Sequence, residues 1–215
     1  MTAAAPAAPA ADCPICPRLA AFRAANRATY PEFFNAPVPS FGGLDARLLV
    51  VGLAPGLKGA NRTGRPFTGD YAGDLLYATL IRFGFARGHY AARPDDGLAL
   101  VGCRIVNAVR CVPPENKPTP TEIGLCNPFL ANELDHLPNL RAVLALGSIA
   151  HAGVLTALGR RKSALKFAHG AEHAVRPDLT LFDSYHCSRY NTNTGRLTSA
   201  MFEAVVGRIR QHLPL

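Results

Sequence analysis

Short apolar runs alternate with amphipathic segments along this 215-residue chain, and the alternation restricts the folds that it can adopt. The apolar runs cover residues 46–53, 102–109, 142–146 and 179–185. Strands separated by helices are typical of a parallel sheet wrapped by helices. We therefore predict a single-domain, three-layer α/β/α fold with a central, mostly parallel, four-stranded sheet.

Helical patterns follow the apolar runs, at residues 73–83, 119–136, 148–158 and 198–213. In the second, Thr119 can cap the helix, Pro120 suits its first position and Glu122 completes a capping box. An apolar stripe along the last helix predicts packing against the core. The stripe consists of Leu197, Met201, Val205, Ile209 and Leu213.

The composition is that of a globular domain with a basic surface. Hydrophobic residues make up 48% of the chain and charged residues 18%, and no run approaches the ~18 apolar residues of a membrane span. The Ala- and Pro-rich start lacks the features of a secretory signal. We expect a disordered tip over residues 1–11, a domain over 12–215, and a cytoplasmic protein without membrane contact. The net charge of +8 favours a polyanionic partner.

Four of the six cysteines form two pairs. Cys13 and Cys16 make a C-x-x-C motif, and Cys111 and Cys126 flank a Pro-rich loop and the start of a predicted helix. A chain of this size without an export signal does not call for a disulfide framework. Four sulfur donors suit zinc or an iron–sulfur cluster, and the spacing does not separate the two. Cys103, on a predicted strand, is expected to be a packed thiol.

A ligand site is expected where the first apolar run ends. The run passes at Leu53 into the turn Ala54-Pro55-Gly56, at the carboxyl edge of the sheet, where α/β proteins gather their ligands. The nearest carboxylate downstream is Asp70. Asp70 also precedes a predicted helix, where the helix dipole alone would favour an acidic residue.

Three segments carry a resemblance to a known family. They read VVGLAPGLKGANRTGRPFTGDYAG at residues 50–73, VNAVRC followed by PPENKPTPTE at 106–122, and HCSRYNTNTGRLT at 186–198. Together with the cysteines they resemble the family-five, or type B, uracil-DNA glycosylases from about Cys13 to the end of the chain. The resemblance implies the uracil-DNA glycosylase fold and a structural [4Fe-4S] cluster on Cys13, Cys16, Cys111 and Cys126. It also implies action on DNA that contains uracil or other deaminated bases such as hypoxanthine or xanthine. We expect a monomer.

The resemblance implies catalytic roles for three residues. Asp70 would position or deprotonate the attacking water, or stabilise the positive charge that develops on the sugar. Asn107 would pair with the Watson–Crick edge of uracil, provided that its amide is held in one orientation. His186 would donate a hydrogen bond to the base as negative charge builds on it.

Further residues would bind the substrate and the DNA around it. Phe67 would stack on the extruded base, and Gly52 and Ala54 would complete the pocket. Seven polar or aromatic residues are expected to contact the DNA backbone and groove. These are Asn61, Arg62, Arg65, Ser188, Arg189, Tyr190 and Asn191. Cys187 stands where the family has Pro, and we interpret it as a tolerated small residue.

Two alternatives remain open from the sequence. One is a glycosylase that prefers a different damaged base, and the other is a non-catalytic iron–sulfur DNA-binding protein with the same fold. No lysine occupies a motif position suited to a Schiff base, which favours a monofunctional enzyme that uses water. His169 and His173 have no assigned role.

Overall fold

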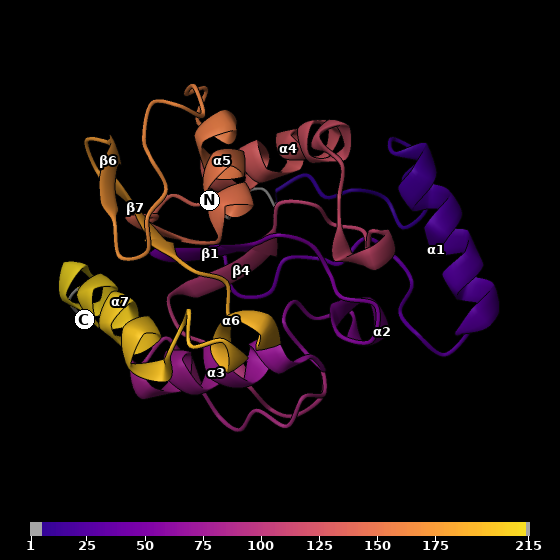
Figure 1. Cartoon of the computed structure of the whole chain (residues 1–215), viewed down its shortest axis with the longest axis horizontal. Coiled ribbons are helices and arrows are strands. Elements are labelled where there is room, and N and C mark those ends of the chain that lie inside the picture. The colour runs from indigo at the N-terminus through magenta and orange to yellow at the C-terminus, as the bar shows by residue number, and fades with distance from the viewer. Residues whose placement is uncertain (1–5, 214–215) are drawn as a thin grey trace.

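A five-stranded sheet forms the centre of the computed structural model, which describes residues 6–213 (Figure 1). The strand order is β4-β1-β5-β7-β6. The strands are β1 (Leu48–Gly52), β4 (Cys103–Asn107), β5 (Ala142–Leu146), β6 (Glu172–Arg176) and β7 (Leu179–Ser184). Four of them run parallel and β6 runs antiparallel to β7, so the predicted mostly parallel sheet in an α/β fold is confirmed.

The predicted count of four strands is corrected by β6, which adds a fifth strand at one edge. Only Val175 of its five residues is buried. A strand that buries one side chain carries no apolar run, so hydrophobic patterning does not reveal it. The structure also has a small hairpin, β2 (Ala86–Arg87) with β3 (Ala99–Leu100), that the sequence did not predict.

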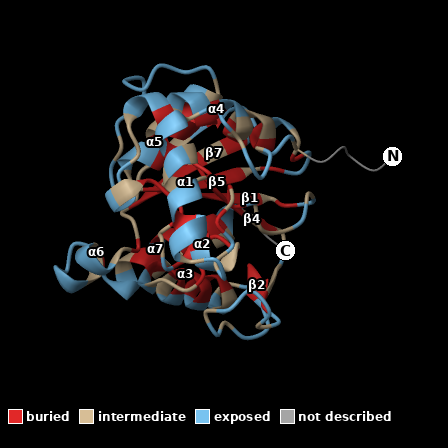
Figure 2. Cartoon of the chain, turned by 90° about the vertical axis from the view of Figure 1, so that its right-hand side faces the viewer, coloured by how far each residue is buried: buried red, intermediate tan, exposed pale blue. Residues whose placement is uncertain are grey.

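Helices cover both faces of the sheet and complete the three predicted layers (Figure 1). On one face, α3 (Tyr71–Arg82) and α7 (Ser199–His212) pack on side chains such as Val50 of β1. On the other, α4 (Pro120–Asp135) and α5 (Ser148–Ala157) pack on side chains such as Val51. Buried residues lie along the strands and the inner sides of these helices, and exposed residues lie on their outer sides (Figure 2).

The remaining helices are α1 (Pro17–Thr29), α2 (Ala60–Thr63) and α6 (Arg189–Asn193), with a 3-10 turn at Pro114–Asn116. None of these was predicted. In α1, Leu19 is the one apolar side chain that is fully buried, and α2 and α6 are about one turn long. Such short or weakly apolar helices depend on tertiary contacts rather than on an amphipathic pattern.

The capping box of α4 is confirmed. Thr119 Oγ1 accepts a hydrogen bond from the Glu122 backbone N–H at 3.2 Å, and Glu122 Oε2 accepts one from the Thr119 backbone N–H at 2.7 Å. Arg18 of α1 forms an ion pair with the same Glu122 carboxylate at 2.8 Å. The cap therefore also ties α1 to α4.

The stripe of α7 is wider than the sequence predicted. Val205, Ile209 and the flanking Leu197 and Leu213 are buried as expected, and Phe202 and Val206 join them. Met201 is only partly buried and packs at the edge of this core.

The start of the chain is partly described. Residues 1–5 of the expected disordered tip, and residues 214–215, lie outside the described residues. The Ala7 backbone N–H contacts the Asn132 side chain on α4. Among the described residues, no helix combines the length and the apolar character needed to cross a bilayer.

Candidate active site and cysteine cluster

A cavity lies at the carboxyl edge of the sheet, beside the turn that follows β1. Its volume is about 240 Å³. It is lined by Ala54, Pro55, Gly56, Ala60, Phe67, Asp70, Ala72, Asn107 and His186. The structure thus brings together five residues that the sequence assigned to a substrate site, from segments up to 132 positions apart.

Gly52 makes this assembly sterically possible. It pairs with Asn107 in the register of β1 and β4, at the end of both strands. A Cβ atom on Gly52 would lie 2.4 Å from Asn107 Oδ1 and 2.5 Å from Phe67 Cζ. Only glycine at this position lets the amide and the aromatic ring close over the strand end.

Asn107 is buried, with an exposed fraction of 3%. Its Oδ1 atom has no hydrogen-bond partner among the described residues. A buried amide oxygen without a donor costs about 1–3 kcal/mol, so the atom calls for a donor, which a bound ligand or an ordered water can supply.

Asp70 begins α3 as its N-cap residue and turns its partly buried carboxylate toward the cavity lining. Its Oδ1 atom also lacks a hydrogen-bond partner among the described residues. A Cβ on Gly59 would lie 2.4 Å from Asp70 Oδ2. Burial raises the pKa of Asp70, while the backbone N–H groups of Ala72 and Gly73 act in the opposite direction. The carboxylate is therefore more basic than a free aspartate.

Phe67 and His186 both line the cavity, with their rings tilted against each other. Their ring centroids are 5.8 Å apart, and Phe67 has the left-handed backbone conformation with φ of 51°. That conformation is uncommon for an aromatic residue and is maintained only where neighbouring contacts enforce it. Burial lowers the pKa of His186 to about 4, so the ring is neutral at neutral pH, with one nitrogen that donates and one that accepts.

The segment after His186 is fixed by local hydrogen bonds. Asn191 Nδ2 donates to the His186 carbonyl at 2.9 Å, and Ser188 Oγ caps α6 by accepting from the Asn191 backbone N–H at 3.4 Å. Cys187 is fully buried in the main core. It is a packed small residue, as the sequence suggested.

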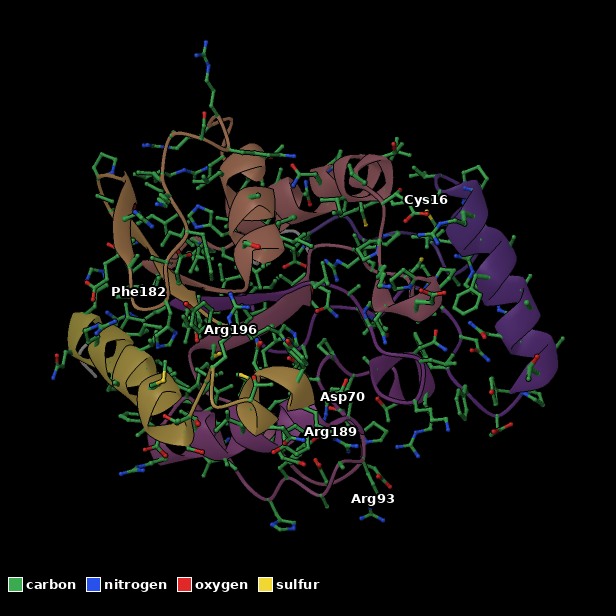
Figure 3. The ribbon with its side chains drawn as sticks, viewed as in Figure 1. Cys16, Asp70, Arg93, Phe182, Arg189 and Arg196 are labelled. Carbon is green, nitrogen blue, oxygen red and sulfur yellow. The ribbon has the colours of Figure 1, made fainter. Side chains whose placement is uncertain are left out.

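A wider groove of about 910 Å³ adjoins the cavity and opens beside Asp70. Arg189 lies along it, with its guanidinium 5.3 Å from the centre of the Tyr71 ring (Figure 3). Asn116 also lines it, in a left-handed conformation with φ of 57°. Asn116 was not among the site residues predicted from the sequence. Its one signal was the turn-forming PPENKP stretch, where Asn tolerates such a conformation.

The structure buries two of the seven residues that were expected to contact DNA. Arg65 is buried and forms a bidentate ion pair with Asp96, at 2.8 and 2.7 Å. Asn61 is buried and donates to Asn35 Oδ1 at 2.9 Å. Both side chains form hydrogen bonds within the protein, and these bonds hold neighbouring loops together. Arg62, Arg189 and Tyr190 are exposed, and Ser188 and Asn191 are partly exposed.

The four paired cysteines meet in a second cavity of about 320 Å³ between α1 and α4. Cys13, Cys16, Cys111 and Cys126 all line it. Figure 3 shows Cys16 at the start of α1, well apart from Asp70. Burial raises the pKa of Cys126 to about 11 and also raises the pKa of Cys111. These two free thiols are therefore protonated at neutral pH, and a metal would have to displace their protons.

The four sulfur atoms are not drawn together as the ligands of a bound zinc ion would be. Among the described residues, no three of the four sulfur atoms lie within 4.8 Å of one another. A tetrahedral zinc ion with Zn–S bonds of about 2.3 Å would draw its sulfurs to about 3.8 Å apart. Two N–H groups point at the sulfurs: Arg23 Nη1 at 3.5 Å from Cys111 Sγ, and the Arg110 backbone N at 3.4 Å from Cys126 Sγ.

His173, which had no assigned role, belongs to a hydrogen-bonded group behind the site. The buried Asp183 of β7 contacts His151 Nδ1 at 2.8 Å and His173 Nε2 at 3.2 Å. His151 Nε2 lies 3.0 Å from the Leu165 carbonyl. His169 Nδ1 accepts a hydrogen bond from the Tyr185 backbone N–H at 3.2 Å. These contacts attach β6 and the preceding loop to β7.

Comparisons with known proteins agree with the site. The family model described as "Uracil DNA glycosylase superfamily" matches residues 39–210. The chain is 47% identical over 199 residues to a type-5 uracil-DNA glycosylase of Thermus thermophilus, covering 90% of each chain. It is 40% identical to a type-5 uracil-DNA glycosylase of Pyrobaculum aerophilum, covering 92% of this chain and 87% of that one. A type-5 uracil-DNA glycosylase of Mycobacterium tuberculosis is 39% identical, with 90% and 75% covered.

Proposed function

Because the chain belongs to the uracil-DNA glycosylase superfamily, and its relatives over most of its length are type-5 enzymes, we propose that it removes uracil from DNA. The reaction is hydrolysis of the bond between uracil N1 and the sugar C1′. The products are free uracil and an abasic site.

One observation carries the proposal: two side chains of the same cavity each hold a buried oxygen atom to which no described residue donates a hydrogen bond. These are Asn107 Oδ1 and Asp70 Oδ1. Uracil bound in the cavity would supply its N3–H group to Asn107, and the attacking water would supply an O–H group to Asp70. A site that is complete only with a base and a water fits base hydrolysis better than simple DNA binding.

Base recognition would proceed by extrusion of the nucleotide into the cavity. Phe67 offers the ring face on which the base stacks. Asn107 pairs with the Watson–Crick edge, and the closely packed Gly52 limits the positions open to the amide. Arg62, Ser188, Arg189, Tyr190 and Asn191 remain the proposed DNA contacts, since each is at least partly exposed.

The chemical step assigns one role to each polar group. Asp70 accepts a proton from water as the water oxygen bonds to C1′ and the C1′–N1 bond breaks. His186, neutral because of its lowered pKa, donates a hydrogen bond to the departing base as the bonding electrons move onto it. The base then takes up a proton from solvent, and Asp70 releases to solvent the proton that it accepted, so the net reaction adds one water molecule. Leu53 and Ala54 after β1 are apolar, so Asp70 is the nearest carboxylate for the water.

Asn116 is a second candidate for holding the water. It lines the groove beside Asp70, and a Cβ on Gly56 would have Asp70 Oδ2 at 3.4 Å and Asn116 Oδ1 at 3.9 Å. Both oxygens therefore face the same glycine at the mouth of the cavity. A water between them could donate one hydrogen bond to Asp70 and another to Asn116 Oδ1. The neutral amide would hold the water without taking its proton.

For the cysteines we propose a [4Fe-4S] cluster, with zinc as the alternative. Four sulfur donors around one cavity support a metal centre, and the family pattern of the cysteines favours the cluster over zinc. The cluster would supply a structural crosslink between the start of α1, the segment after β4 and α4. Cys111 lies four residues after Asn107, so the crosslink would also fix the strand end that reads the base.

A duplex with a single uracil tests the proposed function. The purified protein should convert it to an abasic duplex that breaks only after alkali, as a monofunctional enzyme requires. Duplexes with hypoxanthine or xanthine measure the range of bases. Tight binding to the uracil duplex without any abasic product would favour the non-catalytic alternative.

A further inference from the structure

The segment from Phe67 to Asp70 carries both the stacking ring and the catalytic carboxylate, and its backbone is strained at Phe67. Phe67 has φ of 51° and Gly69 has φ of 87°. Two residues separate Phe67 from Asp70, so a small rotation in this segment would move both side chains. Contacts from outside the segment must hold it in place.

Tyr90 makes such contacts, from the loop between β2 and β3. Its hydroxyl donates to the Phe67 carbonyl at 3.1 Å and accepts from the Gly69 backbone N–H at 3.4 Å. One oxygen atom thus bridges both sides of Thr68. The first turn of α3 closes on the same point, because a Cβ on Gly73 would lie 2.3 Å from the Tyr90 hydroxyl and 1.9 Å from the Phe67 carbonyl.

A buried ion pair fixes the loop that presents Tyr90. Asp96 accepts from the Ala91 backbone N–H at 2.9 Å and from both terminal nitrogens of Arg65. Arg65 Nε in turn donates to Thr68 Oγ1 at 2.7 Å. Arg65 therefore joins the Tyr90 loop to the very segment that Tyr90 bridges. This internal role explains why the Arg65 guanidinium is buried and does not lie on the surface that would face DNA.

We propose that Tyr90 is a positioning residue for the reaction, whose hydroxyl aims Phe67 and Asp70 at one cavity. The inference rests on the proposed function. The Tyr90 ring packs on the Tyr77 ring at a centroid distance of 4.7 Å. The ring therefore contributes to core packing, while the hydroxyl holds the segment from Phe67 to Asp70. Burial raises the pKa of Tyr90 to about 12, which keeps the hydroxyl a donor over the working pH range.

The test compares Tyr90→Phe with Tyr77→Phe. Both changes remove one hydroxyl and keep the ring, and Tyr77 is the more deeply buried; its hydroxyl donates to the Pro66 carbonyl at 2.6 Å. A misplacement of about 1 Å costs on the order of 10²-fold in rate. Tyr90→Phe should lower the single-turnover rate on uracil duplex by roughly tenfold or more. Its affinity for a duplex with a non-cleavable uracil analogue should change less than about twofold.

The Tyr77→Phe control distinguishes a loss of positioning from a loss of stability. Tyr77→Phe should lower the melting temperature at least as much as Tyr90→Phe does, yet keep a near wild-type rate. Rate losses that merely follow the loss of melting temperature in both variants would overturn the inference, as would a near wild-type rate in Tyr90→Phe. A wild-type protein without activity would overturn the proposed function, and the inference with it.

Discussion

Arg23 places its Nη1 atom 3.5 Å from Cys111 Sγ and its Nη2 atom 2.9 Å from the Cys13 carbonyl. The guanidinium is buried, with an exposed fraction of 5%. A buried cation that touches two of the cysteine segments needs a negative partner nearby. Four thiolates on a metal centre would supply that negative charge.

Loss of the Arg23 charge should destabilise the metal-bound state of the cysteines. We expect Arg23→Met to reduce the iron and sulfide bound per chain and to speed their loss to a chelator. Arg27→Met is the matched control, since Arg27 lies one turn further along α1 and pairs with the exposed Asp12. Equal retention of iron by wild type and Arg23→Met would contradict the role given to Arg23.

Removal of a cysteine should affect stability more than chemistry. Cys111→Ser should lower the melting temperature, because the proposed crosslink joins segments about a hundred residues apart. Protein that remains folded should keep most of its single-turnover rate. Metal analysis of anaerobically purified wild type decides between the two centres: stoichiometric zinc without iron and sulfide would rule out the cluster and leave the glycosylase proposal intact.

Mutation of Asp70 and mutation of Asn107 should impair different parts of the reaction. Asp70→Asn should lower the single-turnover rate on uracil by roughly 10²-fold or more with nearly unchanged DNA binding. Asn107→Ala should lose activity on uracil and on hypoxanthine by different factors, since the two bases present different edges. Near wild-type rates in Asp70→Asn would leave that carboxylate only the role of beginning α3.

The rate should fall at acidic pH because of Asp70. Its pKa is raised by burial, so the carboxylate takes up a proton at a higher pH than a free aspartate does and can then no longer accept one from water. His186 has a pKa of about 4 and stays neutral throughout the neutral range. Single-turnover rates should therefore be level near neutrality and decline about tenfold per unit below the pKa of Asp70. The residual activity of Asp70→Asn should lack this decline.

DNA affinity should depend steeply on salt through the exposed arginines of the groove. Arg189→Ala should reduce the slope of log affinity against log salt by about 1, because one phosphate contact is lost. Arg176→Ala is the control: Arg176 is exposed on β6 and pairs with Asp135. An unchanged slope in Arg189→Ala would remove Arg189 from the DNA interface.

The sequence predicted those parts of the molecule that local patterns encode. Buried parallel strands appear as apolar runs, and the cap of α4 appears as Thr119 and Glu122 at the required spacing. Local patterns could not predict that Arg65 is buried in an ion pair, because its partner Asp96 lies 31 residues away in an unpredicted loop. Without that pairing, a basic loop residue is indistinguishable from a DNA contact. Tyr90 was missed for the same reason.

The two edges of the sheet are closed to further strands in different ways. At β4, Phe41 exchanges two backbone hydrogen bonds with Ile105, so a passing segment occupies part of the edge. At β6, the strand is irregular between Ala174 and Arg176 and carries the charged Glu172 and Arg176. Irregular, charged edges do not template pairing with a second chain. We therefore expect the folded protein to resist aggregation by edge-to-edge strand pairing.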